Sequence, residues 1–333
     1  MMERYWYAIL ESRELGNKPI GVTRLGQRLV LWRTASGEPA CVAERCAHRG
    51  AALSLGSVRG EHIACPFHGF EFDSTGSCRL IPASGRNAKI PQAMRQRAFP
   101  VREAHGLIFL WFGEVPHTLP PLPWFDDLTG HGEPTLRQEW PVHYTRAIEN
   151  QLDIPHVPFV HKSTIGRGVA PVVDGPAARL ESDKLDIWFT YRPDDGKEAA
   201  SPQELKPEGP AMITFQFPNL WHFHLAPKRS QFIAFAPVDD ERTVLYVRSY
   251  QRMVGAPGLR WLFNALSMVF NAVVLGQDRG VVVTQRPLAS ELRGGEKLVS
   301  SDWPIALFRR RRAERLAVRD SELPTPSVQA TSD

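Results

Sequence analysis

The chain has 333 residues, of which 43% are hydrophobic and 23% charged, and its net charge is +4 at pH 7. This length allows one large domain or two ordinary ones, and this composition is typical of a globular protein with a full core. The small net charge, with no basic stripe interleaved with aromatic residues, argues against nucleic-acid binding.

The cysteines and the first residues indicate the compartment. Four cysteines are few for this length, so we expect no disulfide framework. The start, Met1-Met-Glu-Arg-Tyr-Trp6, lacks the charged-then-apolar pattern of a signal peptide. We therefore expect a reducing, cytoplasmic setting, and we interpret Cys41 and Cys78 as small buried hydrophobic residues.

The first third of the chain reads as short strands joined by turns. Apolar or alternating runs bounded by turn residues occupy residues 5–10, 28–33, 40–43 and 107–113. They predict an all-β N-terminal domain over residues 1–115. The proline-rich segment 116–124 cannot be helix or central strand, and we assign it as a linker.

Two pairs of metal-ligand residues lie within this N-terminal domain. The first is Cys46-Ala-His48 and the second is Cys65-Pro-Phe-His68. Two thiolates and two imidazoles suit either a tetrahedral zinc or a Rieske [2Fe–2S] cluster. Zinc loops with these ligands usually pair cysteine with cysteine and histidine with histidine, whereas each loop here supplies one of each, which favours the cluster.

The region that follows mixes helical and strand patterns. Residues 142–152 read as a helix, and a long helix is expected from about residue 258 into the 280s. Successive antiparallel strands are expected between them, at residues 184–191, 212–217, 220–225, 231–235 and 243–250. The whole chain is therefore predicted to be α+β, with a second domain over residues 125–308 whose long helix packs on an antiparallel sheet.

Two stretches near the C-terminus call for a choice between interpretations. Residues 258–275 are apolar but include Arg260, Asn264, Ser267 and Asn271, so we expect a buried amphipathic helix rather than a membrane span. The arginines at 309–312 open a tail, residues 309–333, that we expect to be loosely ordered with a solvated surface.

Two further histidine pairs are candidate ligands. His156 and His161 are five residues apart, and Pro155 and Pro158 can break the helix so that both rings turn to one point. Such pairs suit iron or zinc, although two unrelated histidines at a helix end would show the same spacing. His222 and His224 alternate on one strand and share a face, with Trp221 and Phe223 on the other. They could line a pocket or bind a ligand, but histidines in a half-buried sheet are the commoner case.

The first two loops resemble a family signature. Cys46-Ala-His48-Arg-Gly-Ala-Ala-Leu53 and Cys65-Pro-Phe-His68-Gly-Phe-Glu-Phe-Asp73 are similar to the Rieske pattern C-x-H-R-G-x-x-L and C-P-Y-H-G-W-x-F-D. This resemblance implies that both cysteines bind one iron and both histidines the other. Phe67 and Phe70 depart from the usual Tyr and Trp and remove a polar hydrogen, which affects the reduction potential rather than the ligation.

A second stretch resembles the iron motif of Rieske non-heme iron oxygenase α subunits, N-x-x-D-x-x-H-x-x-x-x-H. In this chain the motif is Asn150-x-x-Asp153-x-x-His156 and ends at His161. The resemblance implies that His156 and His161 bind iron and that Asn150 lies near it. It also implies that Asp153 bridges by hydrogen bonds between His156 and the cluster ligand His68.

A facial triad needs a carboxylate beside its two histidines. Asp278 is the predicted third ligand, since Gln277-Asp278 followed by apolar residues and Gln285 resembles the family's acidic segment. Glu149 is the alternative, but it lies a turn too early on its helix.

The resemblance covers about residues 1–300 and implies a terminal oxygenase component. The implied fold is a Rieske domain followed by a helix-grip catalytic domain, in a head-to-tail homotrimer. The implied cofactors are the [2Fe–2S] cluster and a mononuclear Fe(II), with O2 as co-substrate. The chain has no dinucleotide fingerprint, so a separate NAD(P)H-dependent reductase, directly or through a ferredoxin, is required.

The chain length is similar to that of shorter α subunits such as vanillate O-demethylase, dicamba monooxygenase and the cyanobacterial toxin hydroxylases. This favours hydroxylation or oxidative demethylation of a small aromatic or cyclic substrate over the runner-up, cis-dihydroxylation of an aromatic ring. The pocket is expected between strands 212–235 and helix 262–275. Two other classes stay open: a Rieske electron carrier without the iron triad, and a zinc-stabilised protein that binds an apolar ligand.

Overall fold

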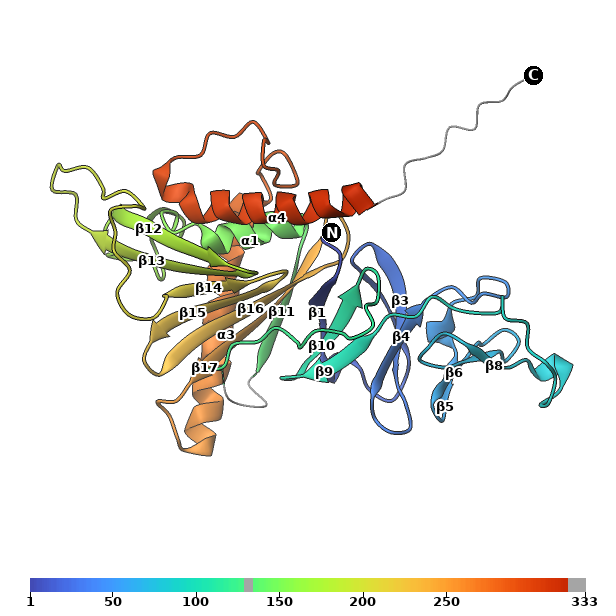
Figure 1. The fold of residues 1–333 in the computed structure, drawn as a ribbon. Coiled ribbons are helices and arrows are strands. Elements are labelled where there is room, and N and C mark those ends of the chain that lie inside the picture. The colour runs from blue at the N-terminus through green and yellow to red at the C-terminus, as the bar shows by residue number, and fades with distance from the viewer. Residues whose placement is uncertain (129–133, 323–333) are drawn as a thin grey trace, which may run out of the picture.

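The N-terminal domain consists of three small antiparallel sheets. We analysed a computed structural model, which describes residues 1–128 and 134–322 (Figure 1). One sheet has the order β1-β10-β9, the next β2-β3-β4 and the last β5-β6-β7-β8. The strands are β1 (Tyr5–Glu11), β2 (Ile20–Arg24), β3 (Gln27–Arg33), β4 (Pro39–Ala43), β5 (Ser57–Arg59), β6 (His62–Ala64), β7 (Glu71–Phe72), β8 (Cys78–Leu80), β9 (Val101–Ala104) and β10 (Leu107–Phe112). The all-β expectation for this region is confirmed.

The second domain is built on one seven-stranded antiparallel sheet. Its order is β11-β17-β16-β15-β14-β13-β12. The strands are β11 (Thr135–Trp140), β12 (Val172–Glu181), β13 (Lys184–Arg192), β14 (Ile213–Gln216), β15 (Leu220–Ala226), β16 (Arg229–Pro237) and β17 (Thr243–Gln251). The helices are α1 (Tyr144–Leu152), α2 (Val157–Val160), α3 (Pro257–Val282) and α4 (Trp303–Glu322). Every strand expected in this region is present, as is the long helix.

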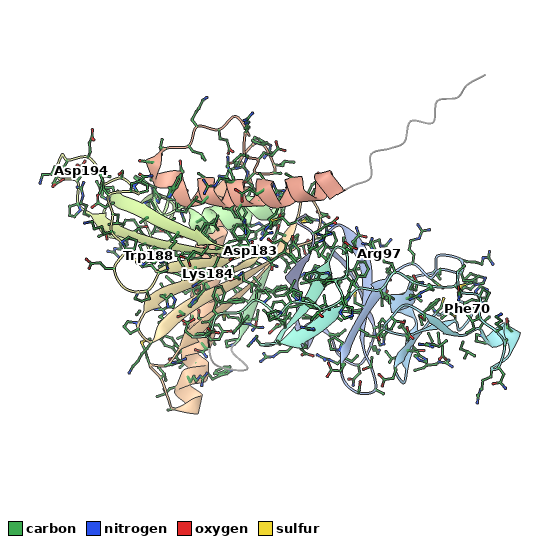
Figure 2. The ribbon with its side chains drawn as sticks, in the orientation of Figure 1. Phe70, Arg97, Asp183, Lys184, Trp188 and Asp194 are labelled. Atoms are coloured by element: carbon green, nitrogen blue, oxygen red, sulfur yellow. The ribbon has the colours of Figure 1, made fainter. Side chains whose placement is uncertain are left out.

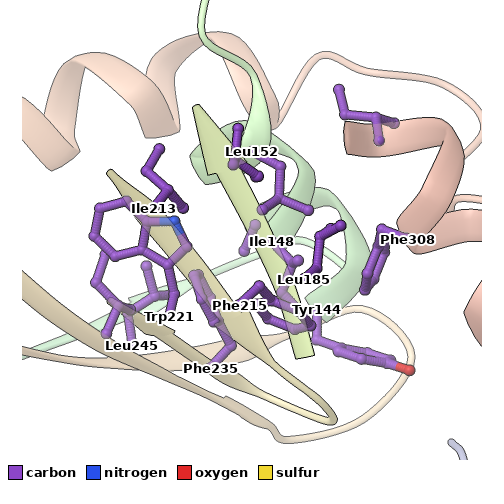
Figure 3. Close-up of a cluster of buried hydrophobic side chains, with 14 of the residues drawn as sticks. Tyr144, Ile148, Leu152, Leu185, Ile213, Phe215, Trp221, Phe235, Leu245 and Phe308 are labelled. Carbon is purple, nitrogen blue, oxygen red and sulfur yellow. The ribbon is translucent and has the colours of Figure 1, made fainter. Parts of the chain in front are cut away.

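Side chains from alternate positions of this sheet form a core under the helices. Phe215 and Phe235 point to one face and meet Ile148 of α1 and Phe308 of α4, and all four are fully buried (Figure 3). Burying a Phe or Ile side chain contributes roughly 1.5–3 kcal/mol, so this layer holds the helices on the sheet. The period of two along each strand therefore decides which face the helices cover.

The opposite face of the sheet carries the N-terminal domain. Trp6 and Phe109 pack with Phe232 and Tyr246 in a shared cluster. The buried Asn219 side chain crosses the boundary, since its Nδ2 donates to the carbonyl of Ala8 at 2.8 Å. The proline-rich segment packs on the same cluster through three residues, Leu119, Leu122 and Trp124. The two domains thus share a continuous core.

The expectation of a loosely ordered tail from residue 309 is wrong for the described part of the chain. Residues 309–322 belong to α4, and the rest lie outside the described residues. Arg309 is 5% exposed and pairs with Glu149 of α1, Nε to Oε1 at 2.6 Å and Nη2 to Oε2 at 3.0 Å. Its Nη1 also lies 2.8 Å from Glu296. The sequence predicts a solvated run of arginines because the partners of Arg309 are distant in the chain.

Helix α3 is also not the buried helix that its composition predicts. In the apolar 18-residue window within residues 258–282, only 17% of the residues are buried, and the helix is long and apolar enough, by length and composition, to cross a membrane. Trp261 and Leu266 are 72% and 62% exposed, whereas Asn264 and Asp278 are buried. The helix turns these polar side chains toward the protein, and Asp278 belongs to the site described below.

The Arg309–Glu149 pair gives a stability prediction. We expect Arg309→Leu to lower the free energy of unfolding by about 3 kcal/mol, because it leaves the Glu149 carboxylate buried with too few partners. Arg310→Ala is the matched control, since the Arg310 side chain is 54% exposed, and it should change stability by less than about 0.5 kcal/mol. Urea unfolding followed by circular dichroism measures both, and equal losses would contradict this role of Arg309.

Candidate functional site

The structure brings Cys46, His48, Cys65 and His68 together at the tips of two loops. The cysteines are 3% and 4% exposed, and the imidazole rings lie outside them with centroids 4.7 Å apart. Burial raises the pKa of the Cys46 thiol to about 11, and the neighbouring Cys65 thiol adds to this shift. Two inner sulfurs and two outer imidazoles fit the ligand division of a Rieske cluster, in which a bound iron would replace the thiol protons.

Each loop is closed by a backbone hydrogen bond to its own cysteine. The amide of Gly50 donates to the carbonyl of Cys46 at 2.8 Å, and that of Gly69 donates to Cys65 at 3.0 Å. Both glycines have positive φ, +74° and +71°. A residue with a Cβ is strained in this conformation, so these glycines let the chain fold back around the ligand side chains.

The two departures from the Rieske pattern place apolar rings against the imidazoles. Phe70 is buried and stacks on His48, with centroids 4.5 Å apart and planes 4° from parallel. Phe67 is 57% exposed, lies 3.9 Å from the ring of His68 and is covered by Arg49 at 5.5 Å. Neither phenyl ring can donate a hydrogen bond, so packing alone holds the imidazoles on these sides.

His156, His161 and Asp278 form a second group. His156 and His161 flank the short helix α2, and their ring centroids are 5.2 Å apart. Asp278 comes from α3, and its Oδ1 lies 3.4 Å from His156 Nε2 and 2.9 Å from His161 Nε2. Candidate ligand atoms from all three residues lie within 4.8 Å of one another. The break between α1 and α2, expected from the two prolines, is what turns both rings toward α3.

Hydrogen bonds at the Nδ1 atoms of His156 and His161 determine that the Nε2 atoms face Asp278. The Nδ1 of His156 lies 2.6 Å from the carbonyl of Asp153, and the Nδ1 of His161 lies 2.8 Å from Gln277 Oε1. Gln277 is held in turn by the Thr164 hydroxyl at 2.7 Å. Holding Nδ1 leaves Nε2 free as a ligand atom. The roles of Gln277 and Thr164 were not predicted from the sequence, where the only signal is that Gln277 precedes Asp278.

The Asp278 carboxylate is buried although one of its oxygens, Oδ1, accepts no hydrogen bond from the described residues. Asp278 is 2% exposed. Burial opposes ionisation, but His156 and His161 outweigh it and lower the pKa of Asp278 to about 2. An ionised, unsatisfied oxygen facing two imidazole nitrogens fits a divalent iron, because two histidines and one carboxylate are the facial donor set of non-heme iron sites.

Glu149, Asn150 and Asp153, the other predicted site residues of this region, lie outside the group formed by His156, His161 and Asp278. Both Glu149 oxygens are engaged by Arg309, so Glu149 faces α4 and not the histidines. Asn150 is partly buried, and its Nδ2 has no hydrogen-bond partner within residues 1–128 and 134–322. The Asp153 carboxylate is 35% exposed and lies 3.9 Å from His156 Nδ1, so within one chain its backbone carbonyl, not its side chain, holds His156.

A cavity of about 340 Å³ opens beside this second group. Its wall is formed by strands β13–β17 and by helix α3, as the sequence analysis expects for a pocket. The apolar lining includes Phe189, Trp221, Phe223, Ile233, Val247, Phe270 and Val274. Polar groups are few, but Gln231 and Asn271 reach it, both hydrogen-bonded to the Ser249 hydroxyl at 2.8 and 2.9 Å. The cavity therefore suits a small, mainly apolar molecule.

His222 and His224 lie on the far side of the same strand. Trp221 and Phe223 point into the cavity, and the two histidines point away from it, toward Asp127. The predicted alternation along this strand is confirmed, so these histidines do not contact a ligand in the cavity.

Comparisons with known proteins agree with this arrangement. The Rieske [2Fe-2S] domain family matches residues 5–99, and the vanillate O-demethylase oxygenase C-terminal domain family matches residues 140–318. The putative toluene-4-sulfonate monooxygenase system iron–sulfur subunit TsaM2 of Comamonas testosteroni is 33% identical over 207 residues, 59% of this chain and 57% of that relative. Methylxanthine N1-demethylase NdmA of Pseudomonas putida is 26% identical over 306 residues, 86% of this chain and 82% of the relative.

Several relatives are only partly matched. The matched region spans 57% of TsaM2 and 38% of the pea chloroplast protein TIC 55. Dicamba monooxygenase, solved with 3,6-dichlorosalicylic acid, superposes with a TM-score of 0.74 at 22% identity, covering 97% of this chain and 99% of that one. At this identity the likeness shows the fold, an N-terminal Rieske domain followed by a large antiparallel sheet with helices.

The two family matches lie on successive parts of the chain. Their residue ranges include both groups of candidate ligand residues, and they imply a [2Fe–2S] cluster, a mononuclear iron and O2 as co-substrate. The second match extends over more than half of the chain. The chain therefore belongs to the Rieske non-heme iron oxygenases, with a catalytic domain of the vanillate O-demethylase type.

Proposed function

We propose that this chain is a terminal oxygenase component that hydroxylates or oxidatively demethylates a small, mainly apolar ring compound. The observation that carries the proposal is the buried Asp278 oxygen, which faces two imidazole nitrogens at the wall of an apolar cavity. When bound, the mononuclear iron supplies O2 activation and the cluster supplies electrons one at a time.

The side chains of the site have separate tasks. His156, His161 and Asp278 would hold the iron at the wall of the cavity. Gln277 and the Asp153 carbonyl keep the imidazole rings oriented. The aromatic and aliphatic wall excludes water from the reacting group, which protects reactive species from side reactions.

The cavity limits the substrate. A volume of about 340 Å³ lies at the small end of ligand pockets, which favours a compound of one or two rings. Gln231 and Asn271 can orient it by hydrogen bonds, and Tyr191 and Arg229 also belong to the lining. Demethylation agrees with the relative named methylxanthine N1-demethylase, and cis-dihydroxylation of an aromatic ring is the alternative outcome.

The electron supply and the assembly belong to the same proposal. A separate NAD(P)H-dependent reductase in the cytoplasm, directly or through a ferredoxin, reduces the cluster. Figure 2 places Phe70, which stacks on His48, at the end of the N-terminal domain remote from the seven-stranded sheet. This separation supports transfer between neighbouring chains of a head-to-tail homotrimer, in which Asp153 of one chain meets His68 of the partner subunit.

The reaction itself can be tested with the iron-loaded protein, a Rieske-type reductase and NADH. We expect substrate-dependent O2 uptake with N-methyl or O-methyl aromatic compounds, and formaldehyde release on demethylation. With ¹⁸O2, a hydroxylated product should gain one labelled oxygen atom, whereas two labelled atoms would show dihydroxylation. An iron content of two per chain without O2 uptake would identify an electron carrier, and a colourless zinc protein would contradict the cluster.

The iron ligands are tested by iron content. Asp278→Ala should lower bound iron from three to two atoms per chain and abolish oxygenation, because it removes the anionic ligand while leaving the cluster in the other domain. Glu149→Gln is the control for the alternative carboxylate, and it should keep all three irons. Iron analysis and the visible cluster spectrum measure both variants, and the opposite pattern would move the third ligand to Glu149.

The bridging role of Asp153 is tested by electron transfer. Asp153→Asn should keep both metals and lower turnover roughly 10–100-fold, the usual effect of removing a group that supports a metal ligand. Asp302→Asn is a control, since Asp302 lies close enough to influence the pKa of Asp153 but caps a short helix instead. In a single-turnover experiment with a pre-reduced cluster, normal cluster oxidation in Asp153→Asn would refute the role.

A further inference from the structure

A second group of metal-ligand side chains lies on the sheet face opposite the iron cavity. Asp127, His222 and His224 place ligand atoms within 4.8 Å of one another. Both histidines come from β15, and their ring centroids are 4.1 Å apart. Asp127 belongs to the segment 125–128 that follows the proline-rich linker, so the group joins that segment to the sheet.

His222 carries the clearest sign of a missing ligand. Its side chain is 1% exposed, and among the described residues nothing hydrogen-bonds its Nε2. The ring of Phe125 packs against it at 5.1 Å between centroids and shields it from water. A buried polar atom without a partner is rare and calls for an explanation, one of which is an ion.

The distances suit a tetrahedral ion. His222 Nε2 lies 3.7 Å from Asp127 Oδ2, and His224 Nδ1 lies 3.5 Å from the same oxygen. Zinc bonds to nitrogen and oxygen of about 2.0–2.2 Å at tetrahedral angles separate ligand atoms by about 3.4 Å. A cavity of about 700 Å³ borders Asp127 and His224, so a fourth position is open to water.

We propose that Asp127, His222 and His224 bind a Zn²⁺ ion that fastens the segment 125–128 to strand β15. This site lies across the sheet from the iron triad and uses none of its residues. The strand it holds carries Trp221 and Phe223 on the cavity side, so the ion stabilises the wall of the cavity from behind. Zinc binding at this site does not depend on the oxygenase reaction.

The proposal is tested by zinc binding to the iron-loaded protein. Equilibrium dialysis followed by elemental analysis should find one zinc per chain beyond the iron complement. Asp127→Asn and His224→Gln should each weaken zinc binding at least about tenfold, since each removes a ligand. Asp126→Asn is the matched control, because Asp126 is the exposed neighbouring carboxylate outside the group, and it should bind zinc like the unmodified protein.

Folding failure does not obscure this test. The Asp127 and His224 side chains are 50% and 34% exposed, and an unchanged cluster absorption spectrum shows that the variants are folded. Zinc should also raise the melting temperature of the unmodified protein and of Asp126→Asn, but not of the two ligand variants. Zinc binding that persists in Asp127→Asn and His224→Gln, or that disappears in Asp278→Asn, would overturn the proposal, as would no zinc binding at all.

Discussion

The buried carboxylate of Asp278 constrains the catalytic domain more than any other single group. An ionised oxygen at 2% exposure is costly unless a cation or a donor faces it, and a metal ion held together with the two nearby imidazole nitrogens would be such a cation. For Asp278 to reach this position, α3 must turn its polar side toward the protein. Asn271, on the same side of the helix, therefore also lines the cavity. Trp261 and Leu266 then face outward, whereas Phe270 and Val274 line the cavity. The helix is thus oriented by the site and not by its own hydrophobicity.

The alternation of side chains along strand β15 places aromatic residues on one face of the strand and histidines on the other. Trp221 and Phe223 form cavity wall, while His222 and His224 face the segment after the linker. A shift of this strand by one residue would exchange the two sets and put imidazoles into the apolar cavity. Its register with β14 and β16 on both sides prevents that shift, so the cavity and the histidine group depend on the same hydrogen-bonded sheet.

Sequence patterns predict those features that are local in the chain. The ligands Cys46, His48, Cys65 and His68 sit in two short loops, and His156 and His161 flank one break in a helix. By contrast, the ion pair of Arg309 joins residues 160 apart, and no local pattern distinguishes that arginine from the exposed Arg310. Local sequence patterns fail to predict the exposure of α3 for the same reason. Hydropathy measures the tendency of each side chain to be buried. In α3, however, the polar face is buried because it contacts groups that are distant in the sequence.

The interface between the domains bears on how electrons reach the iron site. Asn219 binds the carbonyls of Ala8 and Phe235, and Trp6 packs with Tyr246 in one shared core. Separating the domains would expose this core and leave the Asn219 amide without partners, so a swing of the Rieske domain toward its own α1 is unfavourable. The cluster loops lie at the far end of that rigid body (Figure 1). In the proposed homotrimer, the partly exposed Asp153 side chain would therefore bridge by hydrogen bonds between the iron site of one chain and the cluster of a neighbouring chain.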